Sequence, residues 1–159
     1  MGAKGDALAK QFEGKVREAS TVIEKLSDAD WKKATSAEKW SVGVTAHHVA
    51  VSHEGIAGII KTASSGQSMP HVTMDMLHAM NAKHAQEHAG CTQAETLALH
   101  KKNAAGAAAL VRGLSDAELA KSATVLAGMP PMSVEQIVNG ILINHIDEHF
   151  GSIRATVGH

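Results

Sequence analysis

Two histidines near the end of the chain, His145 and His149, are spaced for metal binding. Residues four apart lie one turn above each other on the same face of a helix, close enough for their side chains to bind one ion. Neutral imidazole is also the commonest metal ligand in proteins. Val138 and Ile153 fall on the same apolar stripe, so the pair is predicted to face the interior. Buried imidazoles need a partner, and a metal ion is one candidate.

A third ligand would have to come from another helix, and the adjacent residues His47 and His48 are the first candidates. Neighbours on a helix point about 100° apart, so at most one of them can join a shared centre. Both have apolar neighbours, and the spacing alone leaves the choice open. His84 and His88 form a second pair four apart. Their polar surroundings favour a solvated face, although one of them could line the same cavity.

The other chemically interesting residues are weaker candidates. Glu148 lies about one turn from His145, where it could accept a hydrogen bond from a ligand histidine or assist a bound water. Cys91 is predicted near the start of a helix, where the dipole favours a thiolate, but an ordinary thiol is the stronger interpretation. The five remaining histidines are assigned to the surface: His53, His71, His78, His100 and His159.

Composition limits the classes of protein that fit. A chain of 159 residues with 44% apolar residues is expected to form a single domain over residues 1–159. The net charge of −1, the low aromatic content of 3% and the lack of Tyr argue against nucleic acid or an anionic membrane as the main partner. The single cysteine suits a reducing compartment, so a cytoplasmic location is expected.

The pattern of apolar residues, caps and breakers predicts an all-α protein. Apolar residues step by three and four, and Ser or Thr stands before several of these runs as a helix cap. The methionines are interpreted as core or cavity-lining residues, and Trp40 as packing at the end of the bundle. Helices are expected over residues 6–26, 41–62, 74–88, 92–114 and 133–157, with a short one from 115. With four principal helices and a long connection over 64–72, the expected fold is a four-helix bundle with one long crossover connection.

Three segments resemble the DinB/YfiT-like superfamily. In residues 40–50, WSVGVTAHHVA, a Trp-Ser dipeptide is followed eight residues after the Trp by a histidine that binds metal in that family. Residues 76–82, MLHAMNA, resemble its recurrent Asn-Ala segment. Residues 144–154, NHIDEHFGSIR, resemble its final signature of two histidines followed by an Ile-Arg-like end. The segments follow the family's order and together span most of the chain.

The resemblance implies that His48, rather than His47, is the first metal ligand, with His145 and His149 as the other two. It implies an open three-histidine site for a divalent ion, zinc or nickel first and iron or manganese as alternatives, often within a homodimer. Relatives act as thiol-dependent transferases or isomerases, or as metal-dependent hydrolases. The family often has an acidic residue near position 44, where this chain has Val44.

The predicted function is therefore that of a metal-dependent enzyme. An ion held by three neutral imidazoles keeps its double charge and acts as a Lewis acid towards water or a thiol. The expected partners are a small electrophilic substrate and a low-molecular-weight thiol, and the expected reaction is thiol transfer or hydrolysis. The alternative is a non-catalytic metal- or ligand-binding helical bundle, with a stress-related role as one option.

Overall fold

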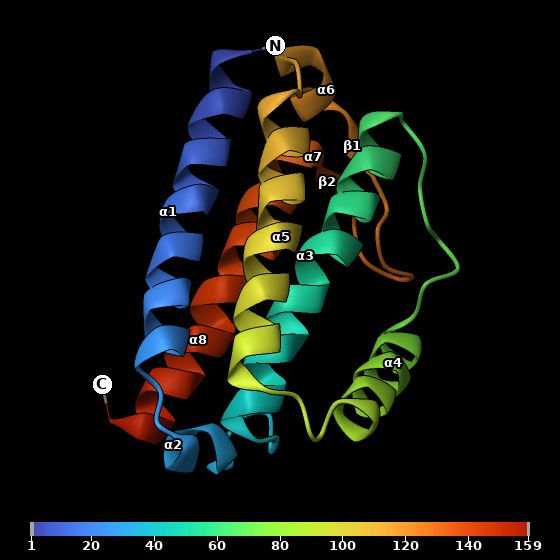
Figure 1. Cartoon of the computed structure of the whole chain (residues 1–159). Helices are drawn as coiled ribbons and strands as arrows, with labels where there is room; N and C mark the ends of the chain where they lie inside the picture. Colours follow the sequence, from blue (N-terminus) through green and yellow to red (C-terminus); the bar gives the residue numbers. More distant parts are fainter. Residues whose placement is uncertain (1, 159) are drawn as a thin grey trace.

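Four long helical segments pack along their lengths in the computed structural model of this chain, which describes residues 2–158 (Figure 1). They are α1, α3, α5 and the continuous run from α7 through η1 to α8. The predicted all-α four-helix bundle is confirmed. In chain order, the elements are α1 (Ala3–Lys25), α2 (Asp28–Lys32), α3 (Val42–Ser64), α4 (Met74–Glu87), α5 (Gln93–Arg112), α6 (Asp116–Ala120), β1 (Ser122–Ala123), β2 (Met132–Ser133), α7 (Val134–Ile137), η1 (Val138–Ile143) and α8 (Asn144–Val157).

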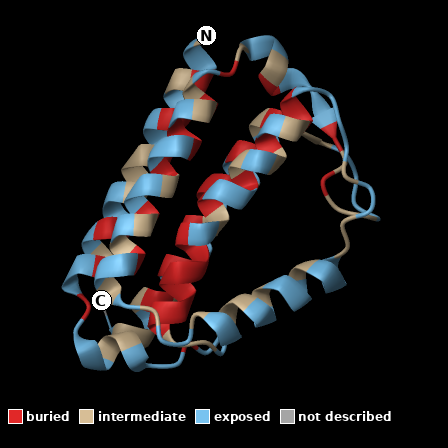
Figure 2. Ribbon diagram, turned by 45° about the vertical axis from the view of Figure 1, so that its right-hand side comes forward, coloured by how far each residue is buried: buried red, intermediate tan, exposed pale blue. Residues whose placement is uncertain are grey.

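The connection between α3 and α5 gives the bundle its topology. Both helices begin at the same end of the bundle and run in the same direction, so the chain has to return between them (Figure 1). This crossover carries α4, which lies beside the bundle. Of the described residues in α4, none is buried, and Figure 2 shows the helix without the red inner face that the bundle helices have. The crossover was predicted from the long connection, and the structure shows that α4 belongs to it.

The core forms from the apolar stripes of the four long segments. Phe12 from α1, Leu142 from η1 and Phe150 from α8 are fully buried, and burying each such side chain stabilises the fold by about 1.5–3 kcal/mol. Five predicted helix starts are confirmed, because a hydroxyl side chain at the N-cap accepts a hydrogen bond from the amide three residues on. The capping residues are Ser41, Thr73, Thr92, Ser115 and Ser133. The helix predicted from residue 6 begins earlier, at Ala3.

Three local features were not predicted. The connector after α1 contains the short helix α2, and residues 122–133 form a hairpin in which Ser122 pairs with Ser133. Strands of two residues are too short to show alternation in the sequence. The last helix also contains a π-helical segment, η1, which ends at Ile143, two residues before His145. Such wide turns occur often at functional sites.

Two histidines assigned to the surface are instead buried in the core. His53 and His100 are 1% and 0% exposed, and 3.0 Å separates Nε2 of His53 from Nδ1 of His100. Nε2 of His100 lies 3.4 Å from the carbonyl of Val16, to which it donates. Burial lowers the pKa of His53 to about 3 and also lowers that of His100. The surface prediction was wrong because these rings satisfy each other inside the bundle.

Several other side-chain predictions can be placed. His71 and His78 are exposed as expected, whereas His159 lies outside the described residues. Met74, Met76 and Met80 are exposed on α4 rather than in the core, because α4 stands off the bundle. Among the helices of residues 2–158, none has the length and apolar character needed to cross a membrane.

Candidate metal centre

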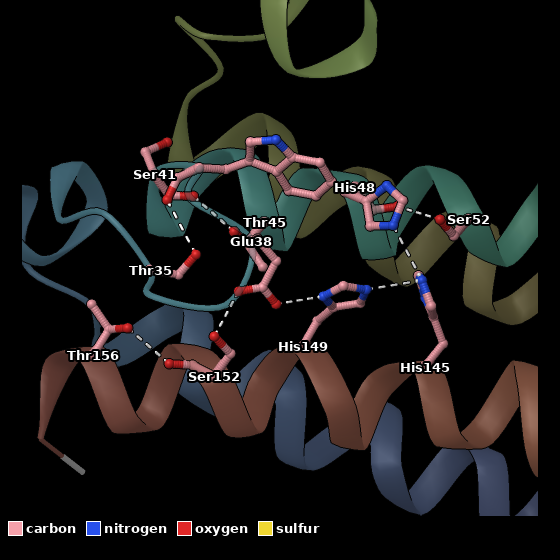
Figure 3. Close-up of polar contacts among 11 residues, drawn as sticks. Thr35, Glu38, Ser41, Thr45, His48, Ser52, His145, His149, Ser152 and Thr156 are labelled. Carbon is pink, nitrogen blue, oxygen red and sulfur yellow. Dashed lines mark hydrogen bonds and ion pairs between the residues drawn. The ribbon is translucent and has the colours of Figure 1, made fainter. Parts of the chain in front are cut away.

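His48, His145 and His149 converge at one point between α3 and α8 (Figure 3). Nε2 of His145 lies 3.1 Å from Nε2 of His48 and 3.1 Å from Nε2 of His149. The His145 and His149 rings are nearly perpendicular, with 78° between their planes, and the planes of His48 and His149 differ by 84°. The same nitrogen of each ring therefore points inward, with the rings fanned around it.

This arrangement fits a metal ion better than a hydrogen-bond network. Nδ1 of His149 faces a carboxylate and must carry its hydrogen, so Nε2 of that ring presents a lone pair. One hydrogen on Nε2 of His145 cannot fully satisfy both of its short contacts. Nitrogens bound tetrahedrally to one zinc ion at about 2.0–2.1 Å would lie about 3.3–3.4 Å apart, close to the spacing found here. The three residues therefore fit a divalent ion.

Glu38 orients one of the three rings. Its Oε2 accepts a hydrogen bond from Nδ1 of His149 at 2.7 Å, and its Oε1 accepts one from the hydroxyl of Ser152 at 2.6 Å (Figure 3). Although burial opposes ionisation, the hydrogen bonds from Ser152 and His149 hold the pKa of Glu38 below its usual range. A carboxylate that fixes the tautomer of a histidine raises its basicity towards metal.

Glu38, and not Glu148, is the carboxylate that contacts a histidine of the cluster. The side chain of Glu148 is exposed, because it lies on the outer side of α8, about 100° around the helix from His149. Glu38 comes from the loop between α2 and α3, a region with no regular pattern. The only sequence signal was its place two residues before the Trp40-Ser41 dipeptide.

The loop that carries Glu38 is held firmly by backbone hydrogen bonds. The amide of Thr35 donates to the carbonyl of Trp40 at 2.8 Å, and the amide of Val42 donates to that of Lys33 at 2.8 Å. Lys39 adopts a left-handed conformation with φ of 64°, which is uncommon for a residue with a Cβ and marks a tight turn. The carboxylate is therefore preorganised by its loop.

His48 and His145 are neutral at physiological pH. Burial, followed by the charge of His149, lowers the pKa of His48 to about 4 and that of His145 to about 3. A neutral imidazole keeps the lone pair that binds metal. Nδ1 of His145 is buried and has no hydrogen-bond partner among the described residues.

A cavity of about 430 Å³ opens beside the cluster. His48 and His145 form part of its wall, and the remaining wall comes from α3, α4, η1 and the loop between the two strands. Apolar side chains predominate, among them Met129 and Met132, so these two methionines line a cavity as predicted. Ser52 and Asn81 are the other polar residues in the wall. A small organic molecule in the cavity could therefore reach His48 and His145.

A model of one protein family covers most of the chain. The family is described as the mycothiol maleylpyruvate isomerase N-terminal domain, and its model matches residues 12–138. The chain belongs to this family. The match ends before His145, so two of the three converging histidines lie beyond it.

Solved structures share the fold of this chain. YfiT from Bacillus subtilis, described as a probable metal-dependent hydrolase with an unusual four-helix bundle topology, superposes with a TM-score of 0.75 at 16% identity, over 97% of this chain and 87% of that one. The mycothiol-dependent maleylpyruvate isomerase superposes with a TM-score of 0.73 at 13% identity. That superposition covers 94% of the present chain and 60% of the isomerase. No curated protein matches the sequence of the present chain.

The other histidine candidates and Cys91 are not among the three converging histidines. His47, next to His48 on α3, groups with His84 and His88. The rings of His84 and His88 are half-buried, so the solvated face predicted from their polar neighbours is only partly solvated. Cys91 is half-buried, and burial raises the pKa of its thiol, which favours the ordinary thiol over the thiolate. Trp40 packs on the His48 ring, with 5.2 Å between ring centroids.

Proposed function

We propose that this protein is a metal-dependent enzyme in which His48, His145 and His149 hold a divalent ion, and that it transfers a low-molecular-weight thiol to a small electrophilic substrate. The observation that carries the proposal is the convergence of three Nε2 atoms at the wall of an apolar cavity. When bound, the ion would act as a Lewis acid that favours the thiolate form of a thiol. Zinc and nickel suit three nitrogen ligands best.

The composition of the cavity wall favours thiol transfer over hydrolysis. Among the described residues that line the cavity there is no Asp, Glu or Lys. Hydrolysis usually relies on a positioned base to take a proton from water, whereas a thiol at a divalent cation is already deprotonated. Glu38 is engaged with His149 and Ser152. The family's isomerase is described as mycothiol-dependent, which agrees with this choice.

The residues of the chain would bind and orient the substrate. The amide of Asn81 and the hydroxyl of Ser52 are polar groups in an otherwise apolar wall, so they are suited to hold a carbonyl or carboxylate of the electrophile. The apolar residues would exclude water, which otherwise competes with the thiol and weakens the electrostatic contacts. A homodimer stays a prediction from the family resemblance, to be measured by light scattering.

The test is a turnover assay on the metal-loaded full chain. Small thiols of several classes are combined with a chromogenic chloronitrobenzene, and turnover is expected only when both metal and thiol are present. His145→Ala should abolish it, whereas Glu148→Gln should leave it unchanged. Ester hydrolysis without thiol would overturn the proposed reaction. A lack of any turnover by protein that retains its metal would favour the non-catalytic alternative.

A further inference from the structure

We propose that His47, His84 and His88 form a second metal site, and that an ion bound there fixes α4 against α3 and so completes the wall of the cavity. The proposal goes beyond the function described above and does not depend on the reaction at the first centre. His47 lies on α3, His84 lies in the last turn of α4, and His88 is the C-cap residue of α4. Each offers a ring nitrogen within 4.8 Å of the others.

The second cluster brings three imidazole rings into mutual contact. Nδ1 of His47 lies 2.8 Å from Nε2 of His84. The His88 ring is 4.4 Å from the His47 ring and 4.8 Å from the His84 ring, measured between centroids. Three imidazoles in contact require a reason, since one shared hydrogen accounts for a single pair only.

One ring nitrogen of the second cluster is buried and unsatisfied among the described residues. It is Nδ1 of His84. Buried polar atoms in folded proteins are usually satisfied by a hydrogen bond or a ligand. A cation shared by the three rings would accept the lone pairs that one hydrogen cannot satisfy.

Packing alone holds α4 weakly. None of its described residues is buried, and Met74, Met76 and Met80 face solvent. Figures 1 and 2 show α4 standing away from the bundle, with loops at both ends. The histidine cluster is therefore its main polar attachment to α3. A metal bound between one histidine of α3 and two of α4 would supply the cohesion that apolar burial does not.

The position of the second cluster links it to the cavity. Leu77 and Asn81 of α4 line the cavity, and His84 follows Asn81 by one turn. The His84 ring is also 5.8 Å from the His48 ring, centroid to centroid. Because His47 and His48 are adjacent on α3, an ion at the second site would fix α4 directly beside the first centre. Substrate access would then depend on occupancy of the second site.

The second site should be weaker than the first. Its rings are stacked, with planes within 34° of each other, so at least one ring must turn before three lone pairs meet. No carboxylate contacts His47, His84 or His88 among the described hydrogen bonds and ion pairs. Loss of such a partner costs about 10–100-fold in metal affinity, so the second ion is expected to bind about 10–100-fold more weakly than the first.

The test is a Zn²⁺ titration of the metal-stripped full chain against a chromogenic chelator. The wild type should take up two equivalents, the second more weakly. The double variant His84→Ala/His88→Ala should take up one, with the tight equivalent unchanged, while His78→Ala, an exposed histidine on the same helix, should keep both. His145→Ala should lose the tight equivalent and keep the weak one, which separates this proposal from that for the first centre.

Hydrogen exchange provides the second readout. Amide protection in α4 should rise as the weak equivalent binds, and this rise should be absent in the double variant. Because α4 buries none of its described residues, alanine at positions 84 and 88 leaves the bundle folded, which circular dichroism checks. Saturation of the wild type at one equivalent, two equivalents in the double variant, or unchanged protection of α4 would each overturn the proposal.

Discussion

The two histidine clusters are built from the same parts and differ in their surroundings. Each combines one residue of an adjacent pair on α3 with two histidines four apart on another helix. Around His48 the ring planes are 60° or more apart, and Glu38 fixes one ring. Around His47 the rings are stacked and no carboxylate contacts them among the described hydrogen bonds. Residue type and spacing bring ligands together, whereas ring orientation and support decide how ready they are for an ion.

The largest expected effect comes from removing a ligand of the preformed cluster. His145→Ala should weaken zinc binding at the tight site by more than about 100-fold, because even changes to residues behind the ligands cost about 10–100-fold. The competition titration measures it. If His145→Ala and His84→Ala weakened the tight equivalent equally, the distinction between the clusters would be wrong.

The carboxylate behind the preformed cluster should have the next largest effect. Glu38→Gln keeps an acceptor for Nδ1 of His149 but removes the charge, so the affinity of the tight site should fall by about 10–100-fold. Glu148→Gln is the matched control, since Glu148 is exposed on α8. If both variants lost the same zinc affinity, Glu38 would not be the specific support of His149.

The buried pair His53 and His100 tests whether burial of histidines is by itself sufficient for metal binding. The folded-state pKa of His53 is about 3, below the unfolded value of about 6.5. The unfolded state therefore binds the extra proton, and stability is lost as pH falls below about 6.5. Between pH 6.5 and 5 this one residue should cost about 2 kcal/mol of unfolding free energy.

The variant His53→Gln checks the origin of that loss. Glutamine can still donate to Nδ1 of His100 but does not titrate, so urea unfolding at pH 7 and pH 5 should differ less than in the wild type. The titration with Zn²⁺ should be unchanged. A loss of a metal equivalent in His53→Gln would show that this pair is part of a site.

The smallest expected effect concerns α4 without metal. Single alanine substitutions at His84 and at His78 should each change the unfolding free energy of the metal-free chain by less than about 1 kcal/mol, because α4 contributes no buried residue to the core. Thermal and urea unfolding measure it. A much larger loss for His84→Ala would mean that the cluster supports the fold rather than awaiting an ion.

Much of the fold could be predicted because its signals are local. Apolar steps of three and four residues define the long helices, and the hydroxyl caps mark their starts within a few residues. The long connection after α3 indicated the crossover. The π-helical segment and the two-residue strands leave no comparable local trace, because they depend on how the chain closes against its neighbours.

The site was less accessible from the sequence because its contacts are distant in the chain. His145 and His149 could be picked out by spacing and apolar setting, and the choice of His48 needed the family resemblance. That these three bind metal stays a prediction. Glu38 could not be found, since 111 residues separate it from His149. His53 and His100 were misassigned for the same reason, because each ring is satisfied by a partner 47 residues away.

The most direct test of the preformed centre compares two neighbouring residues. His47 and His48 lie side by side on α3 yet belong to different clusters. Metal content is measured by elemental analysis of wild type, His48→Ala and His47→Ala after dialysis that leaves only the tight equivalent. We expect His48→Ala to contain no metal and His47→Ala to retain one equivalent. Loss of the tight ion in His47→Ala alone, or its retention in both variants, would contradict the assignment.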